Sequence, residues 1–335
     1  MPVDRVLLAQ PRGFCAGVEM AIKALVWMVK VYEPPVYCYH EIVHNRLVVD
    51  RFRELGVIFV DDVSEVPDGA PLMLSAHGTA PAVVAAARAK GGTVVDAVCP
   101  LVTKVHHEVK VRAGKDYTVI YIGHEGHDEA VGTMAVAPDS VRLVEEVADV
   151  DALDLPPDTQ VALLAQTTLA MQDWAGIKDR AAERFPDLWM PGRSDLCFAT
   201  TNRQTALQAI ADKSDAVIVI GSENSSNTRA LEKTARSAGC ARVYRVNDAD
   251  EVPDDLEGVV GVTAGASAPE ELIRAVLAKL APRNGVQEVE VTQEEEYFPP
   301  PRELRTLLAE QGKPDALADD RSISASDVLA ELRRL

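Results

Sequence analysis

Residues 14–29 read FCAGVEMAIKALVWMV, a cysteine followed at once by a pattern that favours a helix. The same order of parts returns in VCPLVTKVHHEVKV (98–111) and in LCFATTNRQTALQAIA (196–211). A single free cysteine is most often a small buried packing residue. Because this one recurs at the start of three similar segments, the pattern indicates a shared chemical task for Cys15, Cys99 and Cys197.

Each cysteine segment is followed by two units in which an apolar, strand-like run ends in a polar loop and a helical pattern resumes. The loops of the first unit hold, at nearly the same spacing from the three cysteines, His44, His127 and Ser226. The loops of the second unit hold His77, Thr167 and Ser267. The chain therefore contains three copies of one larger repeat.

Strands that alternate with helices predict parallel sheets, and α/β proteins bind ligands beyond the carboxyl ends of such strands. We therefore expect an α/β fold of three small domains related by approximate threefold symmetry, with the three cysteines meeting at the centre. The expected divisions are residues 1–98, 99–196 and 197–284 for the repeats, 285–312 for a closing segment and 313–335 for a tail.

Composition narrows the classes of partner. The 335-residue chain has 34 Lys and Arg against 52 Asp and Glu, a formal charge of −18, which disfavours nucleic acid and anionic lipid. The opening MPVDRVLLAQP is too short and too soon interrupted for a signal peptide, and no apolar run is long enough to span a membrane. We expect a cytoplasmic protein, in which thiols stay reduced and serve metal binding or catalysis.

Three converging thiolates without a fourth equivalent suggest a metal centre with one open position. Catalytic zinc uses three protein ligands, whereas iron–sulfur clusters favour thiolates throughout, so ligation by cysteine alone favours the cluster. Cys38 lies within a strand pattern and Cys240 follows Gly239 after a helix, and neither has a counterpart in the other repeats. We interpret both as packing residues.

Nine ordered motifs resemble those of the 4-hydroxy-3-methylbut-2-enyl diphosphate reductases, from about residue 4 to residue 305. They are PRGFCAGV, HEIVHN, SAHG, DAVCPLVTKVH, GHEGHDEAVGTM, QTTL, CFATTNRQ, GSENSSNT and GVTAGASAP. The resemblance implies one 4Fe-4S cluster per chain, held by Cys15, Cys99 and Cys197 at the centre of a three-domain trefoil. It also implies the last step of the methylerythritol phosphate route to isoprenoids.

In that family an allylic diphosphate loses its C4 hydroxyl with two electrons and two protons, giving isopentenyl and dimethylallyl diphosphates. The electrons are expected from a ferredoxin or flavodoxin-type donor. By motif, Glu129 matches the proton-relay carboxylate, and Thr167 matches the hydroxyl that connects it to the substrate. His127 is expected near the hydroxyl end of the substrate. The plainer alternative for Glu129 is a carboxylate facing a helix dipole.

Diphosphate binding has neither a P-loop lysine nor an evident arginine clamp in this sequence. The expected binding groups are His44, His77, Ser225, Ser226, Asn227 and Ser267. The sequence SAP followed by two glutamates predicts a helix start with Ser267 as the N-cap, so that backbone donors point toward an anion. Simple N-capping by serine and asparagine is the alternative. We expect the remaining histidines to be structural or solvated: His40, His106, His107 and His124.

Rival functions remain open at this stage. A non-redox 4Fe-4S hydro-lyase would also use three cysteines and an open iron, an iron–sulfur sensor would turn over nothing, and a zinc-stabilised binding module would use the same residues structurally. The segment 285–312 resembles the family's closing segment, which returns toward the first domain. The tail has no assigned function and either stays disordered or forms an amphipathic helix with Val328, Leu329, Leu332 and Leu335 on one face.

Overall fold

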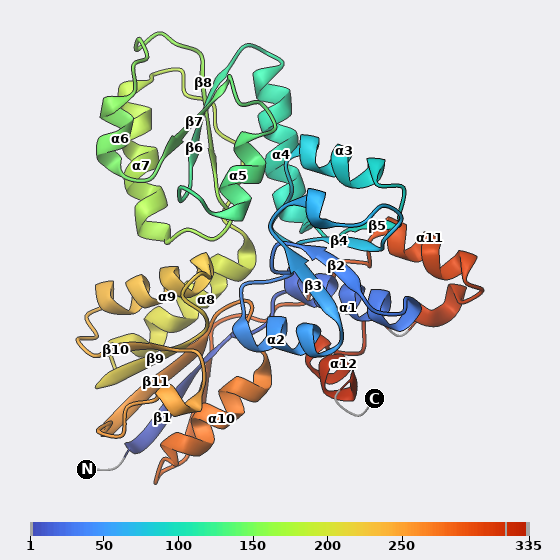
Figure 1. Cartoon of the computed structure of the whole chain (residues 1–335). Helices are drawn as coiled ribbons and strands as arrows, with labels where there is room; N and C mark the ends of the chain where they lie inside the picture. Colours follow the sequence, from blue (N-terminus) through green and yellow to red (C-terminus); the bar gives the residue numbers. More distant parts are fainter. Residues whose placement is uncertain (1–2, 319, 333–335) are drawn as a thin grey trace.

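The computed structural model describes residues 3–318 and 320–332, the side chain of Leu332 excepted. Three parallel sheets, each with its own helices, are arranged around a common centre (Figure 1). This arrangement confirms the predicted α/β fold of three domains in a trefoil.

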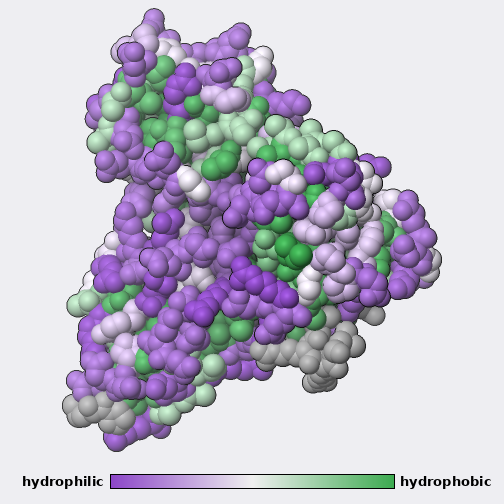
Figure 2. All heavy atoms as spheres, in the orientation of Figure 1, coloured by the Kyte–Doolittle hydropathy of each residue, from purple (hydrophilic) through white to green (hydrophobic). Residues whose placement is uncertain are grey.

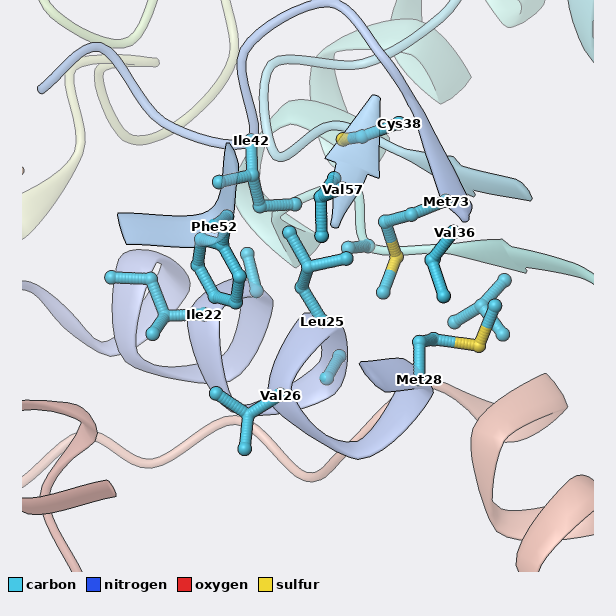
Figure 3. Packing of buried hydrophobic residues seen from close by; sticks show 14 of the residues in the cluster. Ile22, Leu25, Val26, Met28, Val36, Cys38, Ile42, Phe52, Val57 and Met73 are labelled. Atoms are coloured by element: carbon cyan, nitrogen blue, oxygen red, sulfur yellow. The ribbon is translucent and has the colours of Figure 1, made fainter. Parts of the chain in front are cut away.

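The first domain has a four-stranded sheet of order β3-β2-β4-β5. Its strands are β2 (Val36–Tyr39), β3 (Val57–Val60), β4 (Leu72–Leu74) and β5 (Val94–Asp96). Its helices are α1 (Ala16–Val31), α2 (Arg46–Glu54) and α3 (Pro81–Ala89), with a 3-10 turn at Val63–Glu65. Apolar side chains of α1 pack under the sheet, and Cys38 lies among them (Figure 3), so its interpretation as a packing residue agrees with its place in the core.

The second domain has a three-stranded sheet of order β7-β6-β8. Its strands are β6 (Thr118–Ile122), β7 (Val141–Val144) and β8 (Val161–Ala165). Its helices are α4 (Pro100–Ala113), α5 (Asp128–Met134), α6 (Val147–Ala152) and α7 (Met171–Arg184). All five residues of β8 are buried, as expected for a parallel strand covered on both faces.

The third domain has a five-stranded sheet of order β10-β9-β11-β1-β12. Its strands are β1 (Val3–Gln10), β9 (Ala216–Ile220), β10 (Val243–Val246), β11 (Gly258–Ala264) and β12 (Val286–Glu290). Its helices are α8 (Phe198–Ala211), α9 (Ser226–Ser237) and α10 (Glu270–Leu280), with a 3-10 turn at Ala249–Glu251. Cys240 packs in the core between α9 and the sheet, away from the other domains.

The position of β1 differs from the expected division. This strand, assigned by sequence order to the first repeat, pairs in parallel with β11 and β12 in the sheet of the third domain. The physical reason is that β11 and β12 both provide β1 with a long parallel edge for hydrogen bonding. The first strand in the sheet of the first domain is β2. The chain therefore leaves the third domain at Gln10, and the segment that follows carries Cys15 to the centre.

The closing segment reaches both the third and the first domain. After β12 the chain crosses to α11 (Arg302–Glu310), a 3-10 turn (Pro314–Leu317) and α12 (Ala325–Leu332). Leu304 and Leu308 of α11 and Leu329 of α12 are buried in the core around α1, and the burial of Leu329 agrees with the helical alternative for the tail. Val328 is partly buried in that core, whereas Leu335 and the side chain of Leu332 lie outside the described residues.

A buried lysine fastens this tail. Lys23 of α1 lies 2.8 Å from the backbone oxygen of Asp320 and 3.4 Å from the carboxylate of Glu19. The Tyr297 hydroxyl donates to the Asp320 carboxylate at 3.0 Å, and the backbone N–H of Ala325 donates to Glu19 at 2.6 Å. The ammonium is thus paired and hydrogen-bonded, which a buried charge requires.

Candidate functional site

The three repeated cysteines occupy equivalent positions in the structure. Cys15, Cys99 and Cys197 are the N-cap residues of α1, α4 and α8, and all three line one central cavity. Hydrophilic residues cover the seam between the domains on the face that Figure 2 shows. The sequence prediction that one cysteine from each repeat meets at the centre therefore agrees with the placement.

Gly17 shows how closely the sulfurs approach. A Cβ at this position would stand 2.8 Å from the Sγ of Cys99 and 4.0 Å from the Sγ of Cys15. Any larger residue at position 17 would displace the Cys99 thiol. The glycine is thus a requirement of the thiol cluster and not of the local backbone.

The electrostatics of the thiols favour a bound cation. Burial, with the Cys15 charge second, raises the pKa of Cys197 to about 12 and raises the pKa of Cys99 well above its ordinary range. The backbone N–H of Thr200 donates to the Cys197 sulfur at 3.2 Å, so the start of α8 partly offsets a thiolate charge. Three thiolates can share this space only with a positive group between them, and the all-sulfur donor set fits an iron–sulfur cluster.

Glu129 is the buried acid of the cavity. It is 2% exposed, and its two carboxylate oxygens accept from the backbone N–H of Thr167 at 2.7 Å and from the Thr167 hydroxyl at 2.9 Å. Burial raises the pKa of Glu129 to about 7, against the lowering effect of both hydrogen bonds. The carboxylate therefore bonds across to the loop after β8 and does not cap its own helix, α5.

His127 is the N-cap of α5, and its Nδ1 accepts from the backbone N–H of Glu129 at 3.2 Å. Burial, followed by the charge of His44, lowers the pKa of His127 to about 3. The ring is therefore neutral. With Nδ1 fixed as an acceptor, Nε2 carries the hydrogen and can donate within the cavity.

Two histidines of the first domain form a stack beside it. The rings of His44 and His77 lie 3.9 Å apart at 13°, and the ring of His127 meets them edge-on at 5.3 Å and 6.1 Å. His44 Nδ1 lies 3.3 Å from the Glu41 carboxylate. His44 Nε2 and His77 Nδ1 are buried without a hydrogen-bond partner. A buried imidazole nitrogen in that state is suited to receive a ligand.

The polar residues of the third domain are buried and already hydrogen-bonded. The Ser225 hydroxyl caps α9 by accepting from Thr228 N–H at 3.3 Å, as its N-capping interpretation predicts. The Ser226 hydroxyl donates to the Thr168 carbonyl at 3.2 Å. Asn227 accepts from the Ala266 N–H at 2.9 Å. These side chains join the third domain to its own neighbouring loop and to the second domain.

The expected role of Ser267 as an N-cap is wrong. The N-cap of α10 is Pro269, and the Ser267 hydroxyl donates instead to the backbone oxygen of His44 at 2.8 Å. A proline has no N–H to satisfy, and its fixed φ suits the extended backbone that precedes a helix. Ser267 is thereby free to lie in the cavity wall and to join the third domain to the first.

Sequence reasoning missed several residues that shape the site. Arg203 is fully buried, donates to the Gly13 and Phe14 carbonyls beside Cys15, and pairs with Glu294 at 2.9 Å. The acidic run at 294–296 was the only feature of the sequence that could have indicated this ion pair, and Arg203 lies 91 residues before Glu294. His40, set aside as structural, lies 2.8 Å from Asp128 at the edge of the histidine cluster.

Three α/β domains with parallel sheets, each bringing one cysteine to a central cavity, fit a class of enzymes in which cysteines hold a metal centre. The chain belongs to the LytB protein family, whose model matches residues 6–281. It is 45% identical over 311 residues to the 4-hydroxy-3-methylbut-2-enyl diphosphate reductase of Rhodopirellula baltica, covering 92% of this chain and 98% of that protein. It is 48% identical over 307 residues to the enzyme of that name from Mycolicibacterium paratuberculosis, covering 90% and 92%.

A solved structure has the same fold. The E-1-hydroxy-2-methyl-but-2-enyl-4-diphosphate reductase from Plasmodium falciparum superposes with a TM-score of 0.89 at 35% identity, covering 93% of this chain and 100% of that one. These likenesses confirm the family that the nine motifs indicated. In the described part of the chain, no helix is both long and apolar enough to cross a membrane.

Proposed function

We propose that the protein catalyses the reductive dehydroxylation of (E)-4-hydroxy-3-methylbut-2-enyl diphosphate. The substrate takes up two electrons and two protons, its C4–O bond breaks, and isopentenyl or dimethylallyl diphosphate leaves together with water. One observation carries this proposal: a buried carboxylate of raised pKa, Glu129, lies in the same cavity as three cysteine thiols and a pair of unpartnered histidine nitrogens.

The thiols of Cys15, Cys99 and Cys197 would hold one 4Fe-4S cluster per chain. When bound, such a cluster supplies single electrons and a Lewis-acidic iron with an open position. The protein contributes the charge environment: each cysteine is the N-cap residue of a helix, the Cys197 sulfur accepts from the Thr200 N–H, and Arg203 fixes the loop before Cys15. The natural electron donor is proposed to be a ferredoxin or flavodoxin-type protein.

Proton delivery falls to the second domain. With a pKa of about 7, Glu129 keeps a substantial protonated fraction at neutral pH, so it can release a proton to the departing hydroxyl. The Thr167 hydroxyl, 2.9 Å from the carboxylate, would pass this proton to the substrate oxygen. His127 Nε2 would donate a hydrogen bond at the same end of the substrate.

The diphosphate is assigned to the cavity walls that the first and third domains build. The imidazoles of His44 and His77 offer donors that can gain charge, and the groups of the third domain offer neutral hydrogen bonds. The latter are Ser225, Ser226, Asn227 and Ser267. Because every one of these side chains is at most partly exposed, water competes little for the anion.

An anaerobic assay tests the proposal. Protein purified without oxygen is mixed with the allylic diphosphate, with and without a reduced viologen or ferredoxin. Product that forms only with reductant supports the reductase. Conversion without reductant would indicate a hydro-lyase, no conversion would indicate a sensor, and a colourless protein that binds zinc would indicate a structural module.

A further inference from the structure

One carboxylate lies among three histidines at the edge of the cavity. Asp128, the first residue of α5, is 2.8 Å from His40 Nδ1, 3.8 Å from His44 Nε2 and 3.7 Å from His77 Nδ1. The histidines come from loops of the first domain, and the carboxylate comes from the second. Asp128 therefore lies near both of the nitrogens of the His44–His77 stack that lack a hydrogen-bond partner.

Asp128 stands behind these rings and not in the cavity with the ligand. His44 and His77 line the central cavity, and Asp128 is not among the described residues that do so. It lines an adjoining outer cavity together with His40, and the rings of His44 and His127 border both cavities. An anion in the central cavity thus has imidazoles between itself and this carboxylate.

The stacked rings need such a partner if they are to carry charge. Two imidazolium groups 3.9 Å apart repel each other strongly, and burial followed by the charge of His44 lowers the pKa of His77 well below its usual range. Burial alone would raise the pKa of Asp128, but the His40 hydrogen bond and the charges of His77, His40 and His44 lower it to about 2. Asp128 is therefore an anion at every pH at which histidine titrates.

Other charged and polar groups face the cluster as well. Glu41 and Asn224 lie 3.3 Å from His44 Nδ1, and His127 meets the stack edge-on. Asp61 acts on His40 together with Asp128, and both raise its pKa. Of the carboxylates, Glu41 touches His44 alone, so Asp128 is the one placed against both stacked rings.

We propose that Asp128 is a positioning residue of the diphosphate site, holding His44 and His77 so that their imidazoles take up protons as a diphosphate binds. This inference rests on the proposed function. Without a ligand, burial keeps His77 neutral. A diphosphate on the cavity side and Asp128 on the other side together offset the repulsion between two protonated rings.

Simple repulsion between Asp128 and the diphosphate predicts the opposite effect on affinity. A carboxylate near an anion site weakens binding if it acts on the anion directly, so its removal would tighten binding. Coulomb energy falls with distance, however, and the rings lie closer to Asp128 than a ligand beyond them does. The net effect of Asp128 is then to strengthen binding through the histidines.

The variant Asp128→Asn tests the sign, since it keeps the shape and removes the charge. Inorganic pyrophosphate is titrated calorimetrically into oxidised, anaerobic holoenzyme between about pH 6 and 8, where histidine titrates. Buffers of different ionisation enthalpy give the number of protons taken up. We expect wild-type protein to take up protons, and Asp128→Asn to bind about tenfold more weakly near pH 7.5, a loss equal to one unit of histidine pKa, with less proton uptake.

Glu125→Gln is the matched control. Glu125 lies in the same loop and lines the outer cavity, and it has no described contact with these histidines, so affinity and proton uptake should not change. Unchanged or tighter binding by Asp128→Asn would overturn the inference. So would the absence of proton uptake by the wild type, a measurement that holds even if the variant fails to fold. Wild-type protein that binds neither pyrophosphate nor the allylic diphosphate would overturn the proposed function itself.

Discussion

The first and third domains build two adjoining walls of one cavity from the same repeat, yet with different chemistry. At equivalent loop positions the first domain carries His44 and His77, whereas the third carries Ser226 and Ser267. The imidazoles can gain charge, and the hydroxyls cannot. The hydrogen bond from Ser267 to the His44 carbonyl joins the two walls directly. The comparison teaches that the repeated backbone fixes where a side chain stands, while the residue type decides its task.

The largest expected effect concerns the feature that all three domains share. Replacing Cys15, Cys99 or Cys197 by serine should abolish both the cluster absorbance and activity, because the three thiols have no substitute among the lining residues of the cavity. Iron and sulfide analysis of anaerobically prepared protein should give about four of each in the wild type.

Cys38→Ala and Cys240→Ala are the controls for this experiment. Both residues are buried in separate cores and should cost stability without loss of the cluster. Selective loss of the cluster from either variant would show that the threefold equivalence of the domains is the wrong description of the metal site.

The threefold repeat explains how much of this site the sequence could predict. Cysteines at the start of three helices and polar loops at similar spacing were sufficient to predict that Cys15, Cys99 and Cys197 meet. The motifs added Glu129 and Thr167, which the structure places within hydrogen-bond distance. The positions of these residues agree with the sequence because a local pattern decided each one, whereas their roles stay predictions.

Pairings between distant segments could not be predicted in this way. The exchange of β1 into the third sheet depends on which strand edges are free, and no local pattern shows that. The contact of Arg203 with Glu294 joins residues far apart in sequence, as does the contact of His40 with Asp128. The N-cap of α10 was misplaced because the Ser267 hydroxyl donates to the backbone oxygen of His44, which belongs to another domain.

The second-largest effect concerns Glu129 of the second domain, which is expected to act in the chemical step and not in binding, unlike the groups of the first and third domains. Glu129→Gln keeps the shape and an oxygen that can accept from the Thr167 N–H but removes the titratable proton, so the chemical step should slow by ~10²-fold or more. Substrate binding and the cluster should stay nearly intact. Single-turnover kinetics with a pre-reduced enzyme, alongside direct substrate titration, measures the two effects separately.

The pH profile sharpens this prediction. The protonated form of Glu129 predominates below its pKa of about 7 and is lost as the pH rises through that value, so the wild-type chemical step should slow above about pH 7. The glutamine variant should lack this inflection, and Glu125→Gln should retain it. Reduction by Glu129→Gln at the wild-type rate would return the carboxylate to a role at the helix dipole.

A smaller effect compares the histidine wall of the first domain (His44 and His77) with the neutral wall of the third domain (Ser225, Ser226, Asn227 and Ser267). Ser267→Ala removes a neutral group and should weaken substrate binding by ~0.5–1.5 kcal/mol, and Asn227→Ala by a similar amount or more. The factor should be the same at every pH. His77→Asn should instead weaken binding most at low pH, where the imidazole can be protonated. Affinities measured across the histidine range give both results, and a pH-dependent effect of Ser267→Ala would remove the distinction between the walls.

The smallest expected effect on the reaction comes from Ser225, whose hydroxyl is already engaged in capping α9. Ser225→Ala should lower the free energy of unfolding by about 1 kcal/mol, a typical cost for a lost N-cap, because the Thr228 N–H loses its partner. Thermal unfolding of the cluster-loaded protein measures this loss, and Ser225→Thr should recover most of it since threonine also caps helices. Substrate affinity should change less than in Ser267→Ala, because Ser267→Ala also removes the hydrogen bond that holds the His44 backbone, whereas the Ser225 cap holds only the start of α9. If Ser225→Ala instead lost affinity strongly at unchanged stability, the capping interpretation would be wrong, and Ser225 would join Ser267 as a direct ligand on the neutral wall.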